Sequence, residues 1–162
     1  MIRPTACIAL ALGLTFVVAG QAASRSRYVP PVESRQIVAY FGRTYLPGWL
    51  PRGYVFARWS VAPGSGEAEY LHVFFGNHGR KLIWAVDDPA DPRSFYSHEE
   101  CSKHPFGHVA TVNGRRVVYG GGAVGQTATY CIGKGKAVTV WNQYSVSRRT
   151  LERVAVSAAP VG

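Results

Sequence analysis

Short segments with the period of a β-strand, separated by turns, fill most of the chain from residue 54 to residue 141. In residues 54–61 apolar and polar side chains alternate, as they do on a strand with one buried face. The expected buried face carries Val55, Ala57, Trp59 and Val61, and the other face carries Arg58 and Ser60. Because such segments bury their apolar faces by pairing, we expect them to form a sheet.

The later segments have the same character and are joined by turns. Asn113-Gly114, between two such segments, favours a type I′ hairpin because both residues tolerate a positive φ. Residues 81–86 are apolar on both faces, which indicates a central strand. The expected strands are 54–61, about 69–75, 81–86, 108–112, 115–119, 127–132 and 137–141.

Helical spacing of apolar residues occurs at both ends of the domain. The first helix is expected over about residues 33–45, ended by Pro47 and Pro51, and the second over 148–158, capped by Ser147. Their apolar faces would comprise Ile37, Val38, Phe41 and Tyr45 in the first helix and Leu151, Val154, Ala155 and Ala158 in the second. The expected fold class is α+β, with a largely antiparallel sheet of about six or seven strands in a meander and a helix near each end.

The N-terminal segment has the order of a secretory signal peptide. Arg3 precedes an uncharged apolar run at residues 7–19, and small residues follow it. The run is shorter than the roughly 20 residues that span a bilayer, so we expect cleavage, with a retained anchor as the alternative. The predicted organisation is a signal peptide at 1–23, a linker at 24–32 and one extracytoplasmic domain at 33–162. The protein would be secreted or periplasmic, with no transmembrane span after cleavage.

Two cysteines follow the signal segment, Cys101 and Cys131. In an exported chain an even pair most simply forms one disulfide. The bond would close a loop of about 30 residues and stabilise the fold by roughly 3 kcal/mol in the chain-entropy model.

The chain carries 18 Lys and Arg residues against 9 Asp and Glu residues, a formal net charge of +9. This excess favours contact with anionic surfaces such as phospholipid head groups or envelope polymers. The basic residues are scattered, and the alternative is a charge that simply keeps the protein soluble. The expected partner is therefore an anionic envelope component or a partner protein, and nucleic acid is not expected.

Two stretches resemble a known family. LPGWLPRGYVF at 46–56 is a proline-rich entry into a strand, and SRRTLERVAVSA at 147–158 contains the pattern L-x-x-V/I-A-x-S. Together with the Asn-Gly hairpin they resemble the domain of unknown function at the extracytoplasmic end of bacterial anti-sigma-factor and sporulation proteins. The resemblance covers about residues 46–158 and implies an envelope-facing, non-enzymatic or sensing role. It offers no catalytic residues to transfer, and without a sigma-binding segment in this sequence it does not imply sigma-factor inhibition.

Several metal-ligand side chains gather between residues 97 and 108. His98, Glu99, His104 and His108 are the candidate ligands, since zinc takes nitrogen, sulfur and carboxylate donors. Against a metal site, the segment contains no HExxH pattern, and a disulfide at Cys101 would remove its thiolate. The alternative is a polar surface loop anchored by the disulfide.

A hydrolase could be assembled from the wider 87–108 loop, using Ser97, His98 and Asp87 or Asp88. No nucleophile elbow supports it, and proximity in sequence does not create a triad.

Four glycines further along the chain resemble a phosphate-binding loop. Such a loop would open onto a helix, so we interpret these glycines as a flexible strand connection. These glycines are Gly120, Gly121, Gly122 and Gly125.

Aromatic and basic residues on the sheet offer a third kind of site. Arg58, Trp59, Arg115 and Arg116 are the candidate ligand-binding residues, because aromatic rings stack on ligands and guanidinium groups bind anions. We therefore expect an exported, non-enzymatic binding or interaction module that contacts an envelope component or a partner protein. The alternative is a small extracytoplasmic hydrolase or metal-binding protein that uses the 87–108 loop. No catalytic residue and no cofactor is assigned.

Overall fold

The structure is a computed structural model that describes residues 26–63, 69–86, 108–123, 125–133, 136–143 and 145–162. Its main element is a seven-stranded sheet in which every neighbouring pair is antiparallel. The strands are β2 (Val55–Pro63), β3 (Glu69–Asn77), β4 (Arg80–Val86), β5 (His108–Val112), β6 (Arg115–Gly122), β7 (Gly125–Gly133) and β8 (Lys136–Asn142).

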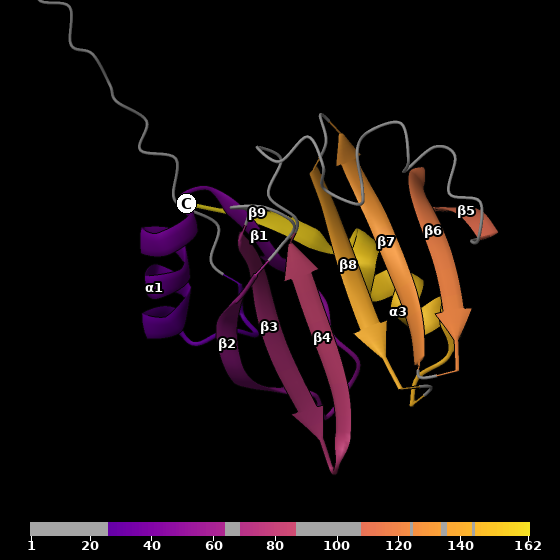
Figure 1. Cartoon of the computed structure of the whole chain (residues 1–162), viewed down its shortest axis with the longest axis horizontal. Coiled ribbons are helices and arrows are strands. Elements are labelled where there is room, and N and C mark those ends of the chain that lie inside the picture. The colour runs from indigo at the N-terminus through magenta and orange to yellow at the C-terminus, as the bar shows by residue number, and fades with distance from the viewer. Residues whose placement is uncertain (1–25, 64–68, 87–107, 124, 134–135, 144) are drawn as a thin grey trace, which may run out of the picture.

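The strand order β2-β3-β4-β8-β7-β6-β5 joins two meanders (Figure 1). β2 to β4 form the first meander and β5 to β8 form the second, and the two meet where β4 pairs with β8. Helix α1 (Pro31–Phe41) and helix α3 (Arg148–Val156) lie near the two ends of the described chain. The predicted α+β class, with a largely meandering antiparallel sheet and a helix near each end, is confirmed.

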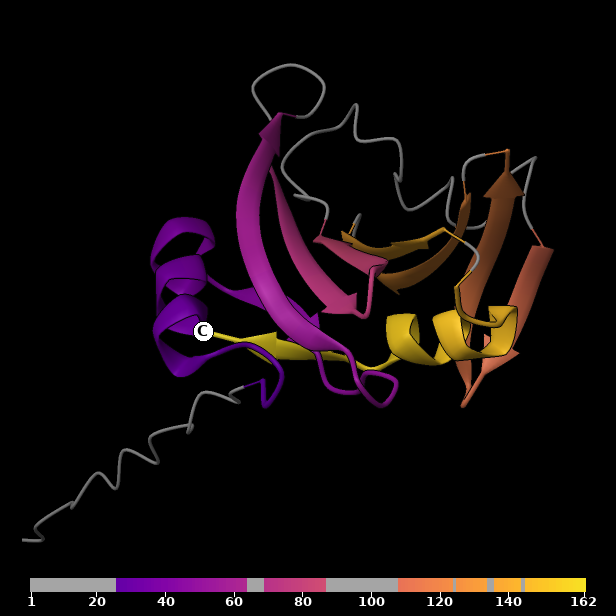
Figure 2. The ribbon, with the colours of Figure 1, turned by 90° about the horizontal axis from the view of Figure 1, so that it is seen from below.

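A second layer covers one face of the large sheet. It consists of α3 and a two-stranded sheet of β1 (Thr44–Pro47) and β9 (Ala158–Val161). Figure 2 shows this layer beneath the curved sheet, with α1 beside the edge strand β2. The opposite face of the seven-stranded sheet has no described helix or strand packed on it, and we call it the open face.

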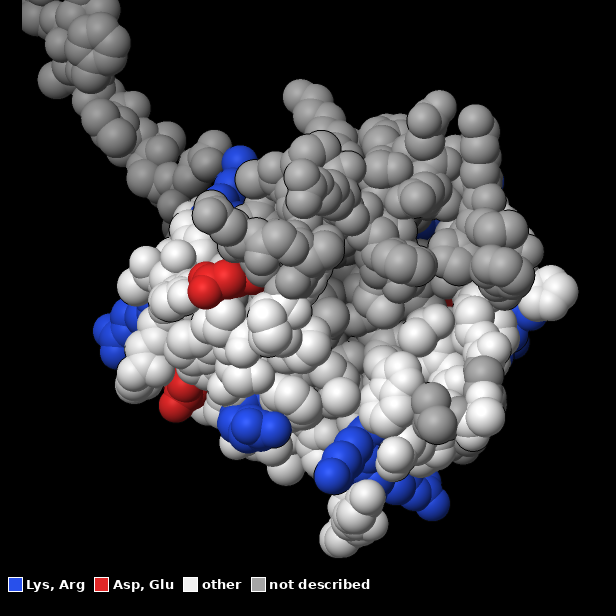
Figure 3. Space-filling view, viewed as in Figure 1, with Lys and Arg blue, Asp and Glu red and all other residues white. Residues whose placement is uncertain are grey.

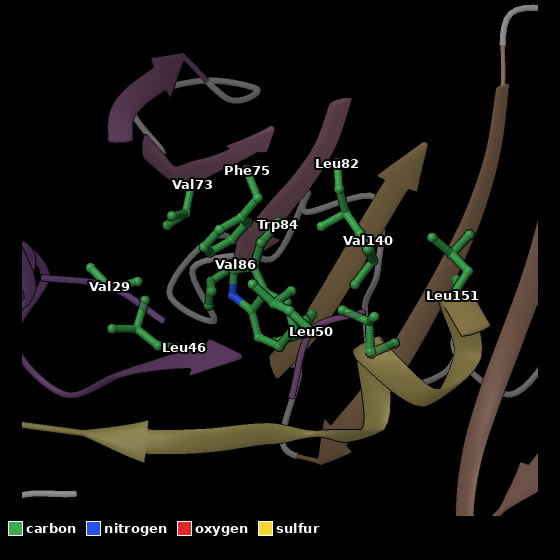
Figure 4. Close-up of a cluster of buried hydrophobic side chains, with 14 of the residues drawn as sticks. Val29, Leu46, Leu50, Val73, Phe75, Leu82, Trp84, Val86, Val140 and Leu151 are labelled. Carbon is green, nitrogen blue, oxygen red and sulfur yellow. The ribbon is translucent and has the colours of Figure 1, made fainter. Parts of the chain in front are cut away.

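The core fills the space between the two layers (Figure 4). Phe75, Trp84 and Leu151 have at most 1% of their surface exposed, so sheet and helix share one interior. The indole N–H of Trp84 donates to the backbone oxygen of Tyr45 over 3.1 Å, which joins β4 to β1. The segment before α1 also reaches this core through Val29, although residues 24–32 are predicted as a linker.

The first helix ends earlier than its apolar spacing predicts. Gly42 adopts a φ of 65°, and its backbone N–H bonds to the oxygen of Val38 over 2.9 Å. Glycine takes this left-handed conformation at little cost, so the helix stops there rather than at Pro47. Tyr45 and Pro47 instead lie in β1, where they pair with β9. The prediction of a helix to residue 45 was therefore wrong at its C-terminal end.

The second helix begins as predicted. The side chain of Ser147 accepts the N–H of Thr150 over 3.2 Å, as an N-cap does. The helix ends at Val156, two residues before the expected limit, because Ala158 starts β9.

A β-bulge changes the faces of β2. Phe56 pairs with Phe75 and Arg58 pairs with Phe74, so Ala57 is the extra residue. An extra residue reverses the alternation of side chains on either side of it. Val55 is consequently 66% exposed, whereas Trp59 packs against the core. The prediction that Val55 and Ala57 share the buried face of Trp59 was wrong for this reason.

In the described part of the chain, no helix is both long and apolar enough to cross a membrane.

Candidate binding site

A row of cross-strand neighbours runs over the open face of the sheet. Arg58 on β2 pairs with Phe74 on β3, and Phe74 pairs with Ile83 on β4. Ile83 in turn pairs with Trp141 on β8. Their neighbours in sequence, such as Phe75 and Trp84, point into the core, so the row itself faces away from the second layer. Phe74, Ile83 and Trp141 are all half-buried, which leaves apolar surface accessible on this face.

This row forms the floor of a hollow of about 630 Å³, which we call the sheet groove. Val55 and Arg58 border it on β2, and the turn between β3 and β4 borders it with Arg80 and Lys81. Figure 3 shows the described part of this face as a mostly uncharged surface with basic side chains gathered along its lower margin. The groove therefore combines an apolar floor with a basic rim.

Arg58 is held over the floor of the groove by a cation–π contact. Its guanidinium carbon lies 4.3 Å from the centroid of the Phe74 ring. Such a contact is worth about 0.5–1 kcal/mol at an exposed site and keeps the cation close to the apolar surface. Within the part of the chain that the structure describes, no carboxylate forms an ion pair with Arg58. The arginine can therefore receive an anionic group from a ligand.

Two glycines, one on β6 and one on β7, lie where a Cβ atom would meet a neighbouring strand closely. A Cβ at Gly125 would lie 2.8 Å from Nε1 of Trp141 and 2.8 Å from the backbone oxygen of Asn142. A Cβ at Gly120 would lie 3.0 Å from the hydroxyl of Thr127. These glycines belong to paired strands, so their expected role as a flexible connection was wrong. The missing side chain of Gly125 lets the Trp141 indole lie close against the sheet.

His72 lies on the open face beside the groove. Its ring makes an edge contact with Phe74, with the two centroids 6.1 Å apart. Burial lowers the pKa of His72 below the usual 6.5, because a desolvated imidazole resists taking a charge. His72 is therefore a neutral polar group next to the groove at neutral pH.

The structure does not bring together the four residues singled out as ligand-binding candidates. Arg58 borders the sheet groove, whereas Trp59 lies on the opposite face and donates its indole N–H to Glu33 over 2.8 Å. Arg115 and Arg116 lie at the start of β6, and Arg115 donates to the backbone oxygen of Val156. The basic candidates thus belong to different surfaces.

The proposed metal ligands fall almost entirely outside the described residues. This holds for His98, Glu99 and His104, and equally for Ser97, Asp87 and Asp88 of the hydrolase alternative. His108 is described and lies exposed at the start of β5. The described residues contain no group of three or more His, Cys, Asp or Glu side chains that could hold a metal ion.

The disulfide stays a prediction. Cys131 lies half-buried in β7, opposite Ala137 of β8. Cys101 is outside the described residues.

Comparison with known proteins gives a fold-level similarity only. No protein-family model matches the chain. No curated protein matches it either. Among solved structures the chain is similar to MucB, in a structure of MucB in complex with MucA(peri), with a TM-score of 0.44 and 17% sequence identity. The match covers 73% of this chain and 36% of the MucB chain, so the chain corresponds to about a third of that protein's length.

Proposed function

We propose that this chain is a non-enzymatic binding module that holds a segment of a partner protein in the sheet groove. The observation that carries the proposal is the row of Arg58, Phe74, Ile83 and Trp141 on the open face. Three half-buried apolar side chains in line, bordered by an arginine without an ion pair in the described part of the chain, are typical of a recognition surface.

The chemistry of the groove defines the kind of segment it would accept. Its floor favours an aliphatic or aromatic side chain, because burying such a group against Phe74 and Trp141 removes apolar surface from water. Its rim carries Arg58, Arg80 and Lys81 and so favours carboxylates beside that apolar group. We therefore expect a partner segment in which an apolar residue is flanked by Asp or Glu.

The module would act outside the cytoplasm. The support for this placement is the signal-peptide pattern of residues 1–23, ahead of a single domain. The mature protein, secreted or periplasmic, would meet partners exposed in the same compartment.

The test is selection of binding peptides from a random library displayed on phage, using the intact exported protein as bait. Enriched peptides should share an apolar residue flanked by acidic residues. Their affinity, measured by fluorescence anisotropy, should fall at least about tenfold for Val55→Asp, because a charge in the groove repels carboxylates and disfavours apolar contact.

Val32→Asp is the matched control. Val32 is 54% exposed on α1 and Val55 is 66% exposed on β2, so both variants place the same charge at an exposed valine. Of these two valines, only Val55 borders the sheet groove. An equal loss of affinity in both variants, or a selection that yields no shared pattern, would contradict the proposal.

A further inference from the structure

A second hollow lies on the other side of the molecule, next to the C-terminal end of α3. It has a volume of about 610 Å³, and Trp49, Asn113, Arg115, Arg153 and Ser157 line it together with residues of β9. We call it the arginine hollow. None of its described lining residues also lines the sheet groove.

Arg153 is positioned in this hollow by stacking. Its guanidinium carbon lies 4.1 Å from the centroid of the Trp49 ring. Trp49 is itself fixed to the end of α3, because its backbone N–H donates to the hydroxyl of Ser157 over 3.0 Å. Stacking uses the face of a guanidinium group and leaves the N–H groups at its edge available. In the described part of the chain, no hydrogen bond or ion pair engages them.

Arg115 supplies the second cation. It donates one N–H to the backbone oxygen of Val156, and its guanidinium carbon lies 5.3 Å from the centroid of the Tyr130 ring. The hydrogen bond to Val156 matters for anion binding, because backbone oxygens at the C-terminal end of a helix carry partial negative charge and repel an anion. Arg115 neutralises one of them, and the hydroxyl of Ser157 donates to another, that of Val154, over 2.7 Å.

Among the residues that the structure describes, no acidic side chain lines the arginine hollow. The acidic residue of α3, Glu152, is engaged elsewhere, by Arg148 over 2.7 Å. Two cations in one hollow without a carboxylate repel each other, and an anion between them relieves that repulsion.

We propose that the arginine hollow binds a phosphate group. One arginine fork satisfies the two oxygens of a carboxylate, whereas a phosphate offers further oxygens and more charge and can engage two arginines together. Strand addition along β9 is disfavoured at this site, because Pro160 has no backbone N–H to donate. The phosphate could belong to a soluble molecule or to a lipid head group, which present the same chemistry to the hollow.

The experiment is a titration of the full exported protein with inorganic phosphate at constant ionic strength, followed by NMR. The signals to follow are the indole N–H of Trp49 and the Nε–H of Arg153. Phosphate should shift both in a saturable manner, and acetate should shift them much less. Arg153→Gln should weaken the apparent affinity about tenfold or more, since a charge-assisted hydrogen bond is lost.

Arg149→Gln is the matched control, because it removes the same charge from an exposed position of the same helix. Equal weakening by both variants, an equal response to acetate, or no saturable shift with phosphate would overturn the proposal. Sedimentation with phosphatidylglycerol vesicles, lost in Arg153→Gln, would assign the phosphate to a lipid. Saturable phosphate shifts without such sedimentation would assign it to a soluble ligand.

Discussion

The indole N–H of Trp59 donates a hydrogen bond to the carboxylate of Glu33 over 2.8 Å and so ties the edge strand β2 to helix α1. A second contact joins α1 to the next strand, since the hydroxyl of Tyr40 donates to Glu69 of β3 over 2.6 Å. An uncovered edge strand invites pairing with other chains, and a helix beside it hinders such pairing. Trp59 therefore has a structural role, which is to hold α1 beside the edge strand β2.

Replacing Trp59 by Phe should lower the free energy of unfolding by about 1–2 kcal/mol, because a hydrogen bond to a charged acceptor is lost. Glu33→Gln should weaken the same contact. If the two residues act through this bond, the double variant should lose less than the sum of the single losses. Urea denaturation of the four proteins measures this, and strictly additive losses would argue against the bond.

Asn142 should be among the most sensitive positions in the fold. It is fully buried, and its side-chain amide donates to the backbone oxygen of Lys81 over 2.6 Å. Its side-chain oxygen accepts the N–H groups of Ser145 and Val146, which lead into α3. Asn142→Ala would leave these partly buried backbone groups without partners and should cost about 2–4 kcal/mol. Thermal unfolding of this variant beside the exposed Gln143→Ala, which should change little, provides the check.

Gly125→Ala should destabilise the protein by about 1–3 kcal/mol, since its Cβ would press on the Trp141 ring and on a backbone oxygen that cannot move aside. Gly76→Ala is the control, because a Cβ there would meet no atom within 4 Å. Differential scanning calorimetry distinguishes the two. A Gly125→Ala protein as stable as the parent would mean that Trp141 does not lie against this glycine.

Cys101 and Cys131 should be joined in the exported protein. Peptide mapping without reductant should recover one cross-linked pair, and two free thiols would refute the prediction. If the bond forms, Cys131→Ser should lower stability by about 2–4 kcal/mol, because the unfolded chain gains the freedom that the closed loop had removed.

The sequence predicts local features of this fold well. Asn113 and Gly114 adopt φ values of 51° and 73°, as the type I′ turn between β5 and β6 requires. Pairing between distant segments is not indicated by any comparable pattern in the sequence. β1 forms because β9 from the end of the chain pairs with it, and the Ala57 bulge is a property of the β2–β3 register rather than of local residue types.

The sheet groove could not be predicted from the sequence, because it also depends on pairing between distant segments. Phe74 and Trp141 could be recognised as aromatic residues of strands, but which face they occupy depends on register. The sequence did not predict that Ile83 lies on an accessible face, because the strand 81–86 was expected to be buried on both faces. In the structure Leu82 and Trp84 are fully buried and Ile83 is half-buried on the open face. Only the β4–β8 pairing places Ile83 beside Trp141.

His72 should make the stability of the protein depend on pH. Burial lowers its pKa in the folded state, whereas an unfolded histidine titrates near about 6.5. The unfolded chain therefore takes up the proton more readily, and protonation favours unfolding. The stabilisation that neutral His72 contributes is fully present above about pH 6.5 and is lost as the pH falls through the folded-state pKa.

The measurement is the free energy of unfolding in urea, determined at several pH values below about 7. The parent protein should lose stability as the pH falls, and His72→Gln should lose less over the same interval because it carries no titrating imidazole. The neighbouring groups on the open face support this assignment, since Ser60 and Ala85, which pair with His72, are uncharged. His108→Gln removes an exposed imidazole from β5 and is the matched control. An equal change of slope in the two variants would show that the burial of His72 is not the source of the pH dependence.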